Sequence, residues 1–148
     1  MLTTRLLGCL GPAEGGRPVA HVSDPKDELE ETYVQWTTEA LATIRSLIEK
    51  LREGDDPDSL LDEIYGISHN IKGMGTSFGY PLMTDIGTSL CAYLRHVKND
   101  RLEVSHDALD VHMKAMDTVF GNRIRGNGGA SGKRLNERLT SVVAKALS

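Results

Sequence analysis

The chain has 148 residues, enough for one domain with a buried core, and its composition of 39% hydrophobic, 26% charged and 5% aromatic residues favours helices. Its net charge of −4 is unevenly distributed, because residues 1–120 carry 11 Lys and Arg against 20 Asp and Glu, whereas residues 121–148 carry 6 against 1. An acidic body with a short basic tail argues against a nucleic-acid-binding protein.

The N-terminal segment, residues 1–23, is rich in Gly and Pro and has no hydrophobic period, so we expect a flexible arm outside the fold. Its apolar run before Cys9 is too short for a signal peptide. No stretch of the chain approaches the roughly 20 apolar residues of a membrane span. Cys9 and Cys91 form neither a metal-site nor a disulfide spacing. We therefore expect a cytoplasmic protein with reduced thiols, no metal, no cofactor and no membrane partner.

The first helix is predicted to begin at Asp24-Pro25, where aspartate suits the N-cap and proline the first helical position, and to end at Gly54. A similar start signal, Asp56-Pro57, opens a second helix that continues to Gly79, a typical left-handed terminator. In both segments apolar residues recur at steps of three and four, which indicates helices that bury one face. The two stripes are Leu29, Tyr33, Trp36, Ala40, Ile44, Leu47, Ile48 and Leu51, and Leu60, Ile64, Ile67, Ile71, Met74 and Phe78.

Two further stripes predict a third helix over about 81–97 and a fourth over about 104–120. Four amphipathic helices with short connections indicate an all-α fold, an antiparallel up-and-down four-helix bundle over residues 24–124. Residues 125–133 are rich in glycine and are predicted to be a linker. Residues 134–148 are predicted to form an additional amphipathic C-terminal helix that packs on the bundle. We expect this protein to be a monomer.

A stretch of the second helix, SHNIKGMGTSFGY, places a single histidine among several glycines. On a helix of about 100° per residue, His69 lies about 160° from Ile67 and about 160° from Ile71, and therefore faces solvent if they face the core. Gly66 precedes His69 by three residues and Gly73 follows it by four, so both glycines flank the ring. Each interior glycine costs a helix about 1 kcal/mol relative to alanine. The economical explanation is access, because bare neighbours let another protein's active site close over the imidazole.

The residue types at this face suit phosphoryl transfer. A neutral imidazole is a competent nucleophile toward phosphorus. Lys72, one turn after His69, can offset the charge of a phosphoryl group. His21, His96, His106 and His112 have no metal-ligand spacing, and we predict no metal site. The residues expected to contact a partner on the same face are Asp62, Tyr65, Gly66, Gly73 and Thr76.

The same stretch resembles the signature of histidine phosphotransfer (HPt) domains, His-x-[Ile/Leu]-Lys-Gly followed six residues later by Gly. The matching positions are His69, Ile71, Lys72, Gly73 and Gly79. The closing FGY is similar to the phosphoacceptor domain of chemotaxis histidine kinases, and the resemblance covers roughly residues 25–120. It implies a helical bundle with His69 exposed midway along the second helix.

The resemblance also implies roles for individual residues. His69 would accept the phosphoryl group through Nε2, Lys72 would interact with that group, and Gly73 would keep the docking surface open. One position departs from the pattern, because chemotaxis kinases have a glutamate about 22 residues after the histidine, where this chain has Cys91. Cysteine cannot serve as that anionic hydrogen-bond acceptor. The departure disfavours direct phosphorylation by a chemotaxis-type kinase domain and favours exchange with the aspartate of a receiver domain.

The leading hypothesis is therefore a phosphocarrier, not an enzyme, that relays phosphoryl groups between the aspartates of response-regulator receiver domains. A hybrid histidine kinase is a further candidate partner. Two alternatives remain open. One is a helical adaptor that binds a receiver or kinase without accepting phosphate. The other is a sensor-kinase fragment, which Gly73 disfavours because dimerisation helices have Thr or Asn-Pro after the basic residue.

Overall fold

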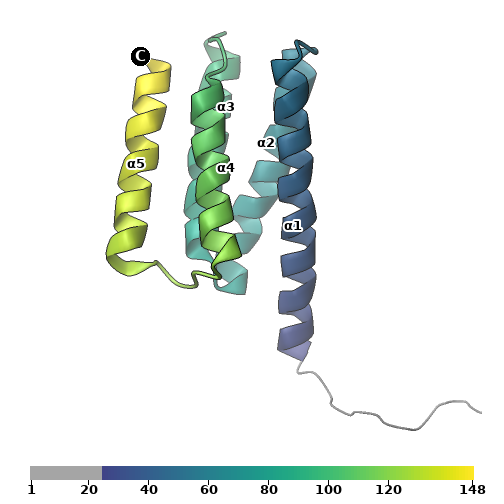
Figure 1. Cartoon of the computed structure of the whole chain (residues 1–148), viewed down its shortest axis with the longest axis vertical. Coiled ribbons are helices and arrows are strands. Elements are labelled where there is room, and N and C mark those ends of the chain that lie inside the picture. Colours follow the sequence, from purple (N-terminus) through teal and green to yellow (C-terminus); the bar gives the residue numbers. More distant parts are fainter. Residues whose placement is uncertain (1–24) are drawn as a thin grey trace, which may run out of the picture. The chain divides into compact units, whose positions relative to one another are not determined.

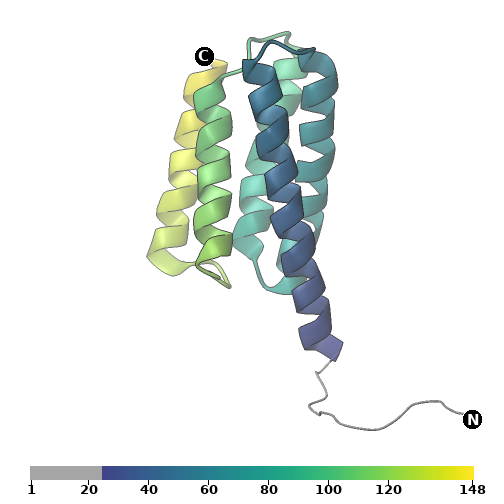
Figure 2. The ribbon, with the colours of Figure 1, turned by 45° about the vertical axis from the view of Figure 1, so that its right-hand side comes forward.

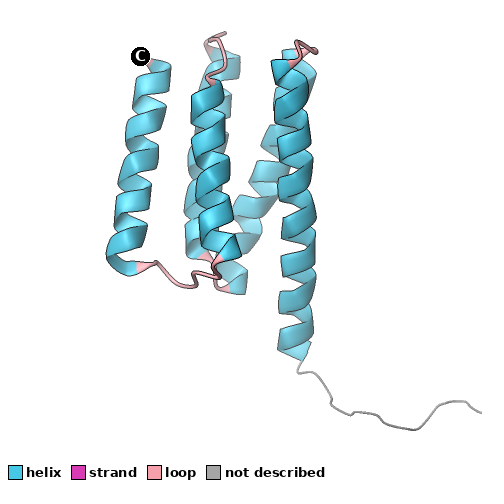
Figure 3. Cartoon of the chain, in the orientation of Figure 1, coloured by secondary structure: helices cyan, strands magenta, loops and turns pink. Residues whose placement is uncertain are grey.

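The computed structural model describes residues 25–148, with side chains from Glu28 onward, so the predicted arm of residues 1–23 lies outside the described residues. The described part of the chain is all-helical and contains no strand, which confirms the predicted fold class at this level (Figure 3). Its helices are α1 (Pro25–Arg52), α2 (Pro57–Gly75), α3 (Pro81–Asn99), α4 (His106–Gly121) and α5 (Gly129–Leu147), with a 3₁₀ turn, η1 (Thr76–Phe78), between α2 and α3. Within this range no helix is both long and apolar enough to cross a bilayer.

The described residues divide into two units, residues 25–35, which form the N-terminal part of α1, and residues 36–148. Tyr33 is buried there, whereas Leu29 is 60% exposed. The sequence predicted Leu29 as the first residue of the buried stripe, and that prediction is wrong.

In the second unit, α3 is the central helix, because it lies along α2, α4 and α5 (Figures 1 and 2). α5 also packs against α4. The later part of α1 is joined to α4 by ion pairs of Arg45 with Asp117 and of Arg52 with Asp110. The largest fully buried side chains of this unit are Ile44, Ile64, Ile71, Tyr80, Leu82, Met83, Ile86, Leu90, Tyr93, Leu109, Met116 and Leu139.

A short 3₁₀ turn connects α2 to α3. α2 ends at Gly75, earlier than the sequence predicted, and the 3₁₀ turn carries the chain to Gly79, whose φ of 88° is left-handed as expected of a terminator. Thr84 Oγ1 accepts hydrogen bonds from Thr76 N (2.9 Å) and Thr76 Oγ1 (3.0 Å) and donates one to Lys72 O (2.9 Å). This hydroxyl therefore fastens the end of α2 to the start of α3.

Gly75 is required by this close approach, so Gly75→Ala should destabilise the fold. A Cβ at Gly75 would lie 2.6 Å from Thr84 Oγ1 and 2.8 Å from both Thr84 N and Tyr80 O. Overpacking of this kind costs about 1–3 kcal/mol, which exceeds the helix-propensity gain of alanine. Urea unfolding of the variant and the wild type measures the difference. Equal free energies of unfolding would contradict the assignment of Gly75 to packing.

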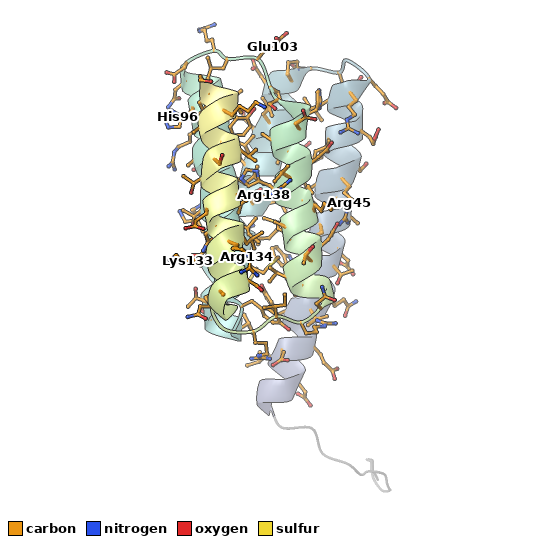
Figure 4. The ribbon with its side chains drawn as sticks, turned by 60° about the vertical axis from the view of Figure 1, so that its left-hand side comes forward. Arg45, His96, Glu103, Lys133, Arg134 and Arg138 are labelled. Carbon is orange, nitrogen blue, oxygen red and sulfur yellow. The ribbon has the colours of Figure 1, made fainter. Side chains whose placement is uncertain are left out.

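The segment predicted as a linker, residues 125–133, is partly helical, because α5 begins at Gly129. Its glycines serve close packing as well as turning: a Cβ at Gly132 would lie 1.8 Å from Asn127 O. The prediction from glycine content placed the start of this helix at residue 134, which is too late. Beyond this turn, the exposed cations Lys133, Arg134 and Arg138 lie along α5 (Figure 4).

α4 contains a buried histidine, His112, which the sequence analysis considered only as a metal ligand. His112 is fully buried, with Nδ1 2.7 Å from Ala108 O and Nε2 2.8 Å from Ser89 Oγ of α3. A carbonyl can only accept, so Nδ1 carries the proton and Nε2 accepts from the serine hydroxyl. Burial lowers the pKa of His112, and its bond to Ala108 partly opposes the shift.

Acidification should therefore destabilise the protein through His112. In the unfolded chain this ring takes up a proton near its ordinary pKa. In the folded protein burial lowers its pKa, so the ring takes up a proton only at a lower pH. The unfolded state therefore binds more protons at acidic pH. The contribution of His112 is intact above about pH 6.5 and is lost as the pH falls, with a slope of at most about 1.4 kcal/mol per pH unit. Urea unfolding between about pH 7.5 and 5.5 should show a steeper loss for the wild type than for His112→Gln. Equal slopes would contradict this prediction.

Candidate functional site

His69 lies midway along α2 with its side chain in solvent, as its helical phase predicted. Gly66 and Gly73 are also exposed, and among the described residues a Cβ at either position would meet nothing within 4 Å. Packing within this part of the chain therefore gives no reason for glycine at these two positions. The absence of side chains leaves the imidazole accessible from both directions along the helix.

Tyr65, one turn before His69, contacts the imidazole ring on the side of α3. The two rings are nearly parallel, with an interplanar angle of 13° and centroids 6.2 Å apart. Arg95 Nη1 of α3 donates to Tyr65 Oη at 3.3 Å, and the Cys91 thiol lies 3.9 Å from Tyr65 O. Tyr65 is thus half-buried and contacted by α3 at both its backbone and its hydroxyl.

Lys72, one turn after His69, is half-buried where α2 meets α3. Its backbone is held by Thr84, as described above, and by the close approach of Gly87. A Cβ at Gly87 would lie 3.0 Å from Lys72 Cβ and 3.1 Å from Lys72 N. Among the described residues no carboxylate forms a salt bridge with Lys72. The ammonium group is therefore available to an incoming anion.

Cys91 occupies the position at which the resemblance led us to look for an acidic residue. The thiol is buried, and this burial raises its pKa, while the charges of Lys72 and Arg95 act in the opposite direction. It is therefore a neutral thiol facing α2. Among the described residues no carboxylate is hydrogen-bonded to the His69 ring, which instead contacts the ring of Tyr65.

The structure separates the five residues predicted to contact a partner. Tyr65, Gly66 and Gly73 surround His69, whereas Asp62 forms an ion pair with Lys98 of α3. Thr76 belongs to the turn after α2, where its backbone N–H and hydroxyl contact Thr84.

Sequence reasoning missed three residues of α3 that support the site, Thr84, Gly87 and Arg95. The interior glycine of this helix was a usable signal, because it often marks a close approach of two backbones. Among the described side chains, from Glu28 onward, no group of three or more His, Cys, Asp or Glu residues is arranged to hold a metal ion.

Comparison with known proteins gives one informative match. No protein-family model matches the chain, and no solved structure gives a significant match. The chain is 27% identical over 122 residues to the chemotaxis protein CheA of Rhizobium meliloti (strain 1021), which covers 81% of the chain. It spans only 16% of the length of that protein. Because so little of the chain is left out, the matched segment includes its centre and therefore the helix that carries His69.

Proposed function

We propose that this chain is a histidine phosphotransfer module that relays phosphoryl groups between the aspartates of response-regulator receiver domains. The observation that carries the proposal is the exposed His69 between Gly66 and Gly73, with open space at both glycines and Lys72 one turn away. The similarity to a chemotaxis protein CheA supports a role in phosphotransfer signalling. As its scaffold we propose an up-and-down four-helix bundle of α1 to α4, to which α5 is added.

The proposed step is an in-line displacement at phosphorus. The Nε2 lone pair of neutral His69 forms the N–P bond, while the P–O bond to the donor's aspartate breaks and the carboxylate leaves with the electron pair. The phosphorylated ring then loses the Nδ1 proton to water. Lys72 offsets the negative charge on the phosphoryl oxygens. Transfer to the next receiver reverses these bond changes.

In this proposal the chain is a carrier and not an enzyme. It contributes a nucleophile and a cation, and the receiver domain contributes the remaining catalytic groups. A neutral, buried Cys91 in place of a carboxylate disfavours direct phosphorylation by a chemotaxis-type kinase domain. The expected partners are therefore receiver domains, including that of a hybrid histidine kinase.

The test is transfer from a panel of purified, phosphorylated receiver domains to this chain. Phosphohistidine is recognised as acid-labile, base-stable phosphate, and the receiver that loses its label identifies the partner. We expect transfer from at least one receiver. Binding to a receiver or kinase without any transfer would overturn the relay and favour a helical adaptor.

A further inference from the structure

We propose that Tyr65, held by Arg95 of α3, positions the His69 imidazole for phosphoryl transfer, in place of a hydrogen-bonding carboxylate. This inference rests on the proposed function and assigns Tyr65 a positioning role within the same site. It changes the role of Tyr65, which the sequence suggested as a partner contact.

The first step is the freedom of an exposed histidine. A side chain that faces solvent on a helix samples several rotamers, so its reactive nitrogen points in several directions. The centroids of the Tyr65 and His69 rings lie 6.2 Å apart, and the two ring planes differ by 13°. This geometry is within the range of favourable offset aromatic stacking. The stack therefore restricts the imidazole to one range of orientations.

The second step is that Tyr65 is itself held. Arg95 Nη1 donates to the Tyr65 hydroxyl at 3.3 Å, and the ring is half-buried rather than free in solvent. Cys91 lies beside the Tyr65 carbonyl on the same side of α2. Because α3 contacts Tyr65 at its backbone and at the tip of its side chain, Tyr65 can transmit the rigidity of the α2–α3 pair to His69.

The third step is that stacking does not block the chemistry. The lone pair of an imidazole nitrogen lies in the ring plane, whereas Tyr65 lies roughly parallel to that plane. The contact is between the two rings and is not a hydrogen bond, so it does not use the lone pair of a ring nitrogen that in-line attack requires. A carboxylate would instead occupy one ring nitrogen through a hydrogen bond.

The experiment compares the wild type with Tyr65→Leu, Tyr65→Phe and Arg95→Met. Phosphoramidate, a small donor that needs no docking surface, forms the N–P bond to His69 as its own P–N bond breaks and ammonia leaves. His96 is an internal reference, because its side chain is 58% exposed and contacts Asp100. Site-resolved mass spectrometry gives the two rates, and NMR of the His69 ring protons reports the stack. A second arm repeats the assay with a phosphorylated receiver.

For Tyr65→Leu we expect the His69 rate to fall about three- to tenfold relative to His96, with loss of the ring-current shift. Tyr65→Phe and Arg95→Met each remove the hydrogen bond that holds Tyr65 but keep an aromatic ring at position 65, so each should lower the His69 rate by a similar and smaller factor, about two- to threefold. An unchanged His69 rate in Tyr65→Leu would overturn the positioning role. A wild type that reacts with phosphoramidate in a Tyr65-dependent way but with no receiver would overturn the proposed relay alone.

Discussion

Replacing His69 with glutamine should abolish phosphoryl acceptance while leaving the fold intact. The amide nitrogen of glutamine is not nucleophilic because its lone pair is delocalised into the carbonyl, so no N–P bond forms. His69 is exposed, and the change should alter the free energy of unfolding by only about 0.5 kcal/mol. Acid-labile, base-stable phosphate on the two proteins after mixing with a phosphorylated receiver measures the first effect, and urea unfolding measures the second.

His96→Gln is the matched control, because it replaces an exposed histidine of the neighbouring helix α3. It should accept phosphate at the wild-type rate. Binding of His69→Gln to the receiver should persist, since the glycines around the site are unchanged. Phosphate that remains on His69→Gln would place the acceptor elsewhere in the chain and contradict the proposed function.

The helical phase of His69 was predictable because it depends on one helix alone. Apolar residues at steps of three and four define the buried face of α2, and any residue opposite that face must point to solvent. Ile64 and Ile71 are buried and His69 is exposed, in agreement with this rule. The open positions of Gly66 and Gly73 follow from the same local geometry.

Relations between helices were not predictable in the same way. The pairing of Arg95 with Tyr65 and the contact of Gly87 with Lys72 depend on how far α3 is shifted along α2. The hydrophobic period of either helix does not fix that shift, because several registers bury the same stripes. Gly132 is a second example of a relation that the sequence did not predict. The glycine content of residues 125–133 suggested a linker, whereas Gly132 lets α5 begin close to Asn127.

Filling the space beside His69 should block transfer from a receiver while stabilising the fold. Gly73→Gln adds a polar side chain where a Cβ meets nothing within 4 Å, and glutamine is a good helix former. We expect the free energy of unfolding to rise by up to about 1 kcal/mol. The rate of transfer from a phosphorylated receiver should fall about 100-fold, because a small displacement of the two reacting groups is enough for a loss of that size.

The small donor separates this effect from damage to the nucleophile. With phosphoramidate, Gly73→Gln should react at the wild-type rate, because no protein surface has to approach. Gly121→Gln, which changes another glycine with open space, lies on α4 and should leave both rates unchanged. If Gly73→Gln accepted phosphate from a receiver as fast as the wild type, the glycine would have no role in access. Greater stability with slower transfer is the outcome expected if these glycines are kept for docking, since Gly75 on the same helix is the one that packing requires.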